Sequence, residues 1–293
     1  MDSDKSAPET QQKKMDKRTR LLVLGIGFAA LAYAAGRLAH HVTESVGGDT
    51  YMTVVIIRSA IAVIAFIALG GVAWLRPSWR SIRETWSFAK PLIIINLVIG
   101  FFVATSVLSG LVNETIAFED AVRIGGYVTV ICFLVGVNEE VMFRGLVYGG
   151  LLAKLGGTST GLLKAAVISS LVFGLMHVVF DVDYANFYSI GSGLLKTLET
   201  GMFAFIFCVP VVKGRNLWGA ITAHGFFDWI VLCGNSIQNG GLSNPTYVSD
   251  NPTVAIAAMV IFGVLCLLYL PRTIRAYKEL RSINEPQYGP FMR

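Results

Sequence analysis

The chain has few charged residues for its length. Asp, Glu, Lys and Arg together make up only 15% of its 293 residues, whereas soluble domains carry about 25%. Hydrophobic residues make up 54% of the sequence. This composition excludes an ordinary soluble domain and predicts a polytopic membrane protein with a single membrane domain. The net charge of +5 does not indicate nucleic-acid binding, because the basic residues flank apolar segments instead of forming one patch.

Cysteine is also scarce, and a secretory signal is missing. All four cysteines lie inside apolar segments and none forms a C-x-x-C pair. We therefore interpret them as small buried hydrophobes and expect neither a disulfide framework nor a zinc-thiolate site. Residues 1–20 are polar, and no A-x-A cleavage pattern follows a short apolar region. We expect no cleaved signal peptide, and we interpret residues 1–20 as a disordered cytoplasmic tail.

What the chain does have is a series of long apolar stretches, each close to the length that crosses about 30 Å of hydrocarbon. The sixth is the weakest, because it contains Lys196 and Glu199, which we interpret as a structural i,i+3 pair. The sequence therefore predicts an all-α protein with about eight transmembrane helices, a membrane domain over 21–275 and a cytoplasmic tail over 276–293. The stretches cover approximately 21–39, 54–75, 91–112, 121–143, 162–180, 194–212, 216–235 and 254–271.

The charges between these stretches alternate in sign. Lys and Arg gather before the first stretch and after the second, fourth, sixth and eighth, while the other connections carry Asp and Glu. Because positively charged loops stay in the cytoplasm, we expect both termini to be cytoplasmic. Loops near residues 45, 117, 183 and 245 should then lie outside.

Ionisable residues inside the apolar stretches predict a functional site. Of the four histidines, only His177 and His224 lie in the apolar body, and a third segment contains Glu139 and Glu140. Such groups are costly at the depth of a bilayer, so a site is the default interpretation. By the helical rise, His177 should lie about 18 Å deep and His224 about 12 Å deep from the cytoplasmic side. We therefore expect a polar cavity in the cytoplasmic half, with water entering from that side.

The spacing of these residues shows which of them share a helix face. Glu140 and Arg144 are four residues apart, as are His224 and Asp228, so each pair lies on one face. Adjacent residues diverge by about 100° around a helix. Glu139 and Glu140 therefore have different tasks, and one of them should face the cavity while the other pairs with Arg144. Glycines at 145, 149, 150, 156 and 157 follow this motif and predict either close helix packing or a break.

Taken in order, Glu139-Glu140-x-x-x-Arg144, Phe173-x-x-x-His177 and His224-x-x-x-Asp228 resemble the CPBP family of intramembrane proteases. That family comprises CAAX proteases and bacteriocin-processing enzymes and is also called Abi. The resemblance covers about residues 121–235. It implies an endopeptidase of a bacterial cell membrane that cuts a membrane-embedded or lipidated peptide or protein near the cytoplasmic face.

The resemblance also implies roles for these residues. Glu139 and His177 would activate a water, His224 and its partner would stabilise the oxyanion, and Phe173 would contact substrate. The last motif position in the family is commonly Asn, whereas this chain has Asp228. An ionised Asp cannot donate a hydrogen bond to an oxyanion. Asp228 is therefore either protonated or an orienting partner of His224.

Whether a metal takes part stays open at this level, as does the class of function. Two histidines and a carboxylate suit Zn²⁺, and its ligands would be Glu139, His177 and His224. These residues come from three segments, however, and the chain has no H-E-x-x-H motif. The alternatives to a protease are a transporter or proton-coupled carrier and a non-catalytic scaffold or immunity protein of the same fold. A transporter predicts internal repeats, which the sequence does not show.

Overall fold

The computed structural model describes residues 15–47, 49–242 and 247–292, and these form helices and connecting turns without a strand. Seven helical segments in this part of the chain are long and apolar enough to cross a membrane. The expectation of an all-α polytopic membrane protein is confirmed. The long helices are α1 (Lys17–Ser45), α2 (Thr50–Ala68), α3 (Trp79–Val112), α4 (Phe118–Glu139), α6 (Ser159–Met176), α7 (Phe187–Gly214), α8 (Trp218–Gln238) and α9 (Pro252–Arg281).

Three shorter elements complete the described fold, namely η1 (Gly71–Leu75), η2 (Glu140–Tyr148) and α5 (Gly149–Leu155). Helix α4 continues without a break through η2 and α5, so the three form one span, Phe118–Leu155. Helix α8 is the remaining long helix of the described chain. It falls outside the apolar set because residues such as His224, Asp228 and Asn235 lower its hydropathy.

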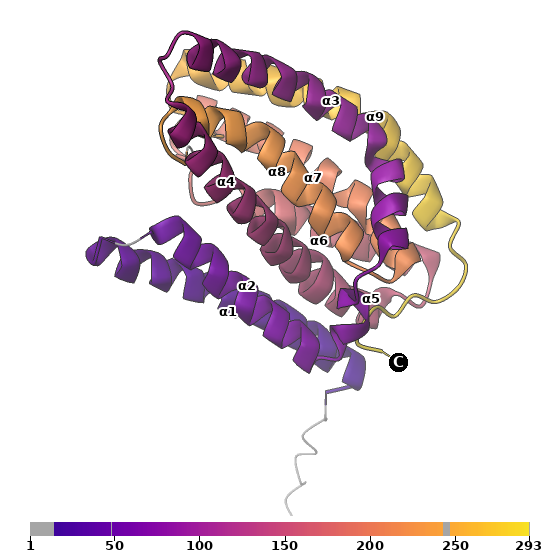
Figure 1. The fold of residues 1–293 in the computed structure, drawn as a ribbon. Helices are drawn as coiled ribbons and strands as arrows, with labels where there is room; N and C mark the ends of the chain where they lie inside the picture. Colours follow the sequence, from indigo (N-terminus) through magenta and orange to yellow (C-terminus); the bar gives the residue numbers. More distant parts are fainter. Residues whose placement is uncertain (1–14, 48, 243–246, 293) are drawn as a thin grey trace, which may run out of the picture.

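The helices form a bundle with two chemically different ends. Figure 1 shows α1 and α2 as a hairpin along one side, next to α4, while α3, α7, α8 and α9 make up the opposite side. The beginning of α1, the η1 turn, α5 and the C-terminus gather at one end, which we call the basic end because most Lys and Arg lie there. The turns α1–α2, α3–α4, α6–α7 and α8–α9 lie at the other, which we call the acidic end.

Several helices are longer than their apolar stretches. Helix α1 begins at Lys17, inside the segment expected to be disordered, because the Asp16 side chain accepts hydrogen bonds from the backbone of Arg18 and Thr19 at 2.9 and 3.0 Å. Hydrogen bonds from Thr19, together with Lys154, hold the pKa of Asp16 well below its usual range. The rest of the expected tail, residues 1–14, lies outside the described residues. Helices extend in this way because capped, charged turns continue them past the apolar core.

The glycines after the glutamate motif permit close packing. A Cβ on Gly150 would lie 3.2 Å from the Cα of Leu22, and one on Gly25 would lie 2.5 Å from the carbonyl oxygen of Leu146. The predicted break comes only at Gly156, where α5 ends. Close helix packing and a break were the two alternatives for these glycines. At Gly150 the structure shows close packing of α1 against α5.

The C-terminal segment, which the sequence predicts to be a cytoplasmic tail over 276–293, packs against the bundle. Helix α9 continues to Arg281, and the following residues fold back against α5. The Gln287 N–H donates to the Gly156 carbonyl at 2.7 Å. Phe291 is buried and meets Phe66 edge-on at 5.5 Å between ring centroids. This segment therefore closes the basic end of the bundle.

Candidate active site

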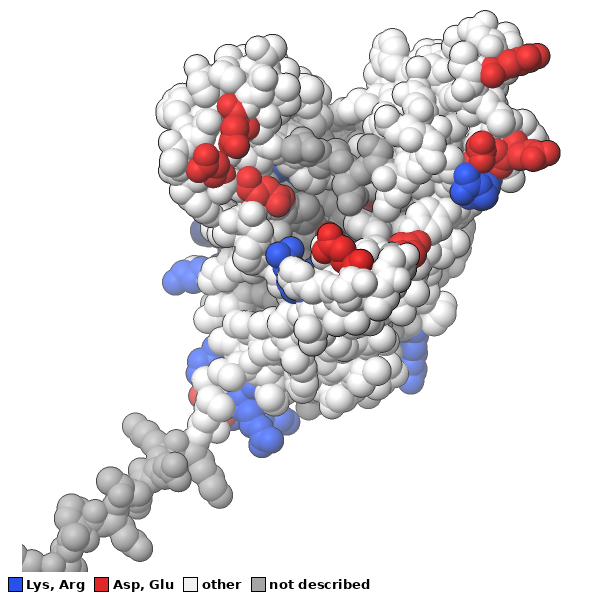
Figure 2. Space-filling view, turned by 90° about the vertical axis from the view of Figure 1, so that its left-hand side faces the viewer, with Lys and Arg blue, Asp and Glu red and all other residues white. Residues whose placement is uncertain are grey.

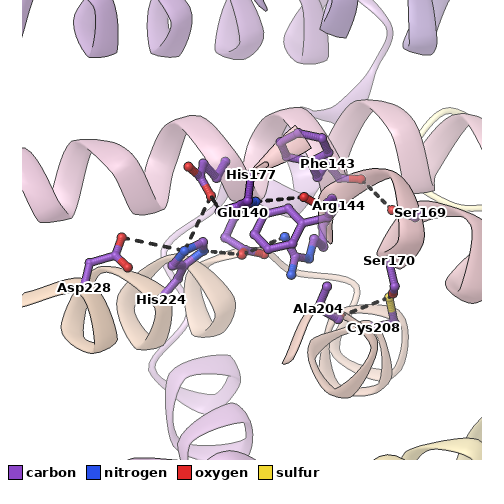
Figure 3. Close-up of polar contacts among 12 residues, drawn as sticks. Glu140, Phe143, Arg144, Ser169, Ser170, His177, Ala204, Cys208, His224 and Asp228 are labelled. Carbon is purple, nitrogen blue, oxygen red and sulfur yellow. Dashed lines mark hydrogen bonds and ion pairs between the residues drawn. The ribbon is translucent and has the colours of Figure 1, made fainter. Parts of the chain in front are cut away.

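The two glutamates lie where α4 changes into the π-helical turn η2, whose nine residues Glu140–Tyr148 are all buried. A π turn inserts an extra residue into the helical ladder, and such turns occur frequently at functional sites. Here the turn begins at the glutamate motif itself. Figure 3 shows the polar contacts that converge on this turn from the neighbouring helices.

Glu140 is at the centre of a fully buried charge network. Its Oε1 lies 2.7 Å from Nδ1 of His224 and 3.1 Å from Nη1 of Arg144. Glu140 is 0% exposed and Arg144 is 1% exposed. The guanidinium carbon of Arg144 also lies 4.1 Å from the ring centroid of Phe173. Glu140 is therefore the glutamate that pairs with Arg144, and its contact with His224 fixes the orientation of that imidazole.

Glu139 faces a different pair of nitrogens. Its Oε2 lies 3.5 Å from Nε2 of His177 and 3.6 Å from Nε2 of His224. Within the described residues this oxygen has no hydrogen-bond partner, although it is buried. Distances of this size are too long for direct hydrogen bonds. A carboxylate oxygen without a hydrogen-bond partner and two imidazole nitrogens thus lie close around one point of the site.

The other nitrogen of each imidazole defines its tautomer. Nδ1 of His177 lies 2.8 Å from the carbonyl oxygen of Phe173, one turn earlier in α6. A carbonyl can only accept, so His177 carries a proton on Nδ1, and in the neutral ring Nε2 is a free acceptor. His177 is the C-terminal cap of α6, which ends at Met176. The apolar stretch 162–180 predicted that His177 lies within a membrane span. The structure instead holds its imidazole at the end of a helix.

Asp228 lies beside His224 but does not bond to it directly. Its Oδ2 is 3.7 Å from Nε2 of His224. Nε2 is thus flanked by two carboxylates, Glu139 and Asp228. Phe173 packs against both imidazoles, with ring centroids 4.5 Å from His177 and 5.8 Å from His224. Phe203 of α7 is a second aromatic neighbour, with its ring centroid 5.5 Å from that of His224. The spacing of the motifs did not predict this residue.

The three candidate metal ligands do not form a compact set. Among the described residues, the only group of His, Cys, Asp and Glu ligand atoms that all lie within 4.8 Å of one another is the exposed set His40, His41 and Glu44. Glu139, His177 and His224 do not form such a group, although Glu139 lies near both imidazoles. The 3.5 and 3.6 Å separations of Glu139 Oε2 from the two Nε2 atoms are close to those between two ligands of a tetrahedral Zn²⁺ with bonds of about 2.0–2.2 Å. The three atoms together do not meet the 4.8 Å limit, so a bound ion would need the two imidazole nitrogens to approach each other.

A cavity of about 410 Å³ extends from the imidazoles between α3, α7, α8 and α9. His177, His224 and Asp228 line it together with Lys196 and Glu199 of α7. Nζ of Lys196 and Oε2 of Glu199 are 2.9 Å apart, which confirms the expected i,i+3 contact. The sequence did not reveal that this pair belongs to the cavity wall.

The cavity continues to Tyr247, in the connection between α8 and α9 at the acidic end. Tyr247 covers Lys196, whose Nζ lies 4.2 Å from its ring centroid. Burial raises the pKa of Tyr247 well above its usual range. Water was expected to enter from the basic end, which the loop charges predict to be cytoplasmic. The cavity instead extends from the imidazoles toward the acidic end.

These features define a helical integral membrane protein with a buried carboxylate–imidazole site. The family model described as type II CAAX prenyl endopeptidase Rce1-like matches residues 123–230. This segment runs from α4 to α8 and contains all three motifs. The resemblance to the CAAX proteases is therefore confirmed over this segment of the chain. No curated protein and no solved structure matches the chain.

Proposed function

We propose that the protein is an intramembrane endopeptidase that hydrolyses a peptide bond of a membrane-embedded or lipidated peptide or protein by a Glu/His-activated water. The observation that supports this most directly is the position of Glu139. Its unpartnered Oε2 lies 3.5 and 3.6 Å from two imidazole nitrogens. A water between these groups could give its proton to a base while its oxygen attacks a carbonyl.

In this mechanism Glu139 and His177 act on the water. The water oxygen bonds to the carbonyl carbon of the substrate while one proton moves to the Glu139 carboxylate. Nε2 of His177 accepts a hydrogen bond from the same water, because its Nδ1 proton is held by the Phe173 carbonyl. When the tetrahedral intermediate collapses, the C–N bond breaks and the stored proton passes to the leaving amine. The products are a carboxylate and an amine, so no further reactant is needed.

His224 stabilises the oxyanion in this proposal. Its Nδ1–H donates to Glu140 at 2.7 Å. In this mechanism the ring also carries a proton on Nε2, beside the carboxylates of Glu139 and Asp228 at 3.6 and 3.7 Å, and this N–H is the donor to the oxyanion. A buried donor aimed at the developing charge is worth about 10² to 10³ in rate. Asp228, 3.7 Å from Nε2, either adds a second donor when protonated or holds the ring in place when ionised.

A transporter receives no comparable support. A carrier built from repeats has paired interruptions in corresponding halves, whereas the π turn occurs in α4 alone among the described helices. A non-catalytic member of the fold would have no need of an unpartnered Glu139 beside two imidazoles.

The test compares membrane peptides from cells that express the wild type or Glu139→Ala. Peptides with new termini should be present only with the wild type. With a substrate found in this way, Glu139→Ala and His177→Ala should lower the cleavage rate by at least about 10³-fold, because the water-activating unit is lost as a whole.

The matched control is Glu119→Ala, which removes an exposed glutamate from the first turn of the same α4 helix and should cleave at the wild-type rate. Each variant should insert and elute as a folded protein. Wild-type turnover by folded Glu139→Ala would remove that residue from the mechanism, and identical peptide sets would contradict the proposed function.

A further inference from the structure

The site is packed shut toward the basic end. Side chains between the imidazoles and that end are almost fully inaccessible, and Leu146, Tyr148 and Leu217 are each 0% exposed. The Leu217 N–H donates to the Trp74 carbonyl at 2.9 Å, and the Trp218 indole donates to the Leu75 carbonyl at 2.7 Å. These bonds connect α8 to η1, and the C-terminal segment covers the neighbouring surface.

The site is open on its other side, and the exposure of its own residues shows this. Away from the cavity, the side chains of Glu140 and Arg144 are 0 and 1% exposed. Of the residues that line the cavity, His177, Asp228 and His224 are 20, 29 and 6% exposed. Glu139, whose Oε2 lies 3.5 Å from Nε2 of His177, is 21% exposed. The exposed groups of the site therefore lie at or next to the cavity.

The lining of the cavity locates its mouth. Ala258 lies six residues after the beginning of α9 and Lys196 nine residues after the beginning of α7. Both helices begin at the acidic end, so these residues lie about 9 and 14 Å below it. Figure 2 shows a hollow between two lobes of the molecule, with Asp and Glu around it and most Lys and Arg at the opposite end.

We propose that water and the substrate segment enter the site from the acidic end, opposite the basic end at which α1 begins. By the distribution of positive charge this is the extracytoplasmic side. The inference rests on the proposed function as far as it concerns cleavage. The partner is then a membrane-anchored protein whose cleavable segment lies on that side.

The outer wall of the cavity indicates what flanks the cut segment. Ile99 of α3 and Ile261 of α9 line the cavity and are 39 and 56% exposed, so this wall offers apolar surface. Opposite them lie the polar groups of α7 and α8. A substrate segment that has apolar residues in the outer leaflet would contact the apolar wall. Its extended backbone would lie beside His224 at the polar wall.

Thiol labelling tests the access route without a substrate. In a background with Cys132, Cys208, Cys233 and Cys266 replaced, one cysteine is placed in the cavity wall as Val231→Cys. Phe118→Cys, 73% exposed at the acidic end, and Val72→Cys, 45% exposed at the basic end, serve as matched references. A charged, membrane-impermeant maleimide is added to sealed vesicles of each orientation.

Val231→Cys should be labelled only in the vesicles in which Phe118→Cys is labelled. Labelling together with Val72→Cys, or from neither side, would overturn the inference whatever the peptidase result. In the peptide comparison with Glu139→Ala, cut sites should map to extracytoplasmic segments. Cut sites in cytoplasmic segments would overturn the inference while leaving the proposed function intact, whereas an absence of cut sites would contradict the proposed function alone.

Discussion

Two adjacent glutamates have opposite environments at the centre of this site. Glu140 is 0% exposed and contacts both Arg144 and His224, whereas Glu139 is 21% exposed and has an unpartnered oxygen. A buried carboxylate needs a compensating charge, which Arg144 supplies. This pairing leaves Glu139 as the carboxylate that is available for chemistry.

At the same residue scale, Asp228→Asn distinguishes the two roles of Asp228. If Asp228 works as a neutral donor, the amide should preserve or raise the cleavage rate, because it offers N–H groups at the same reach. The rate of the wild type, but not of the variant, should then fall as pH rises and Asp228 ionises. If Asp228 orients His224 as a carboxylate, the variant should be slower because a charge-assisted bond is weakened.

The measurement is a pH–rate profile of both proteins with one substrate. Asp250→Asn, at the exposed acidic end, is the control and should give the wild-type profile. Superimposable profiles with equal rates for Asp228→Asn would show that neither role is real.

At the scale of elements, close helix contacts bring the motifs together. A Cβ on Gly136 of α4 would lie 2.6 Å from the carbonyl oxygen of Ile221, and one on Gly225 of α8 would lie 2.8 Å from that of Cys132. The two backbones therefore approach closely one turn from Glu140 and His224. This approach permits the 2.7 Å contact between those two side chains.

Arg144 lies in the π turn and supplies the positive charge next to the buried Glu140. Its Nη1 lies within ion-pair distance of Glu140, 3.1 Å, but without the geometry of an aligned hydrogen bond. Arg144→Ala would leave Glu140 buried without its charge partner and should destabilise the protein by about 3–5 kcal/mol. Unfolding in detergent, followed by circular dichroism, measures this loss.

Arg123→Ala is the matched control, because Arg123 pairs with Asp120 on the same helix while exposed to 69%. Its effect should stay within about 0.5 kcal/mol. Equal stabilities of the two variants would show that Arg144 does not support the turn.

At the scale of the whole molecule, charge separates the two ends of the bundle. The beginning of α1, the η1 turn, α5 and the last described residues share the basic end, and the acidic turns share the other. The positive-inside rule then predicts cytoplasmic termini and an external acidic end. In intact cells, an impermeant thiol reagent should label Glu44→Cys and Asp183→Cys and should not label Arg76→Cys.

This prediction concerns which end of the bundle faces the cytoplasm, whereas the vesicle experiment tests from which end the cavity is reached. The two experiments are therefore independent. The native cysteines do not interfere, because Cys132, Cys208 and Cys233 are buried and are replaced in the same background. Labelling of Glu44→Cys or Asp183→Cys from the cytoplasmic side alone would overturn the eight-span arrangement.

The sequence by itself determined the features that depend on near neighbours in the chain. Composition and stretch length predicted the helical membrane protein, and four-residue spacing predicted the Glu140–Arg144 contact and the proximity of His224 to Asp228. The ordered motifs predicted the family. The sequence predicted the ends of the helices less well. Caps such as Asp16 and the π turn continue the helices past the apolar residues.

Only the tertiary structure decided which glutamate keeps an unpartnered oxygen beside the two imidazoles, where the cavity opens, and that Phe203, Lys196 and Tyr247 line that cavity. These features depend on how α4, α6, α7 and α8 are offset and how closely they approach at Gly136 and Gly225. Such contacts join residues that are far apart in the chain, so no local spacing specifies them. The direction of access follows from which end of the bundle packs shut, and that is a property of all the helices together.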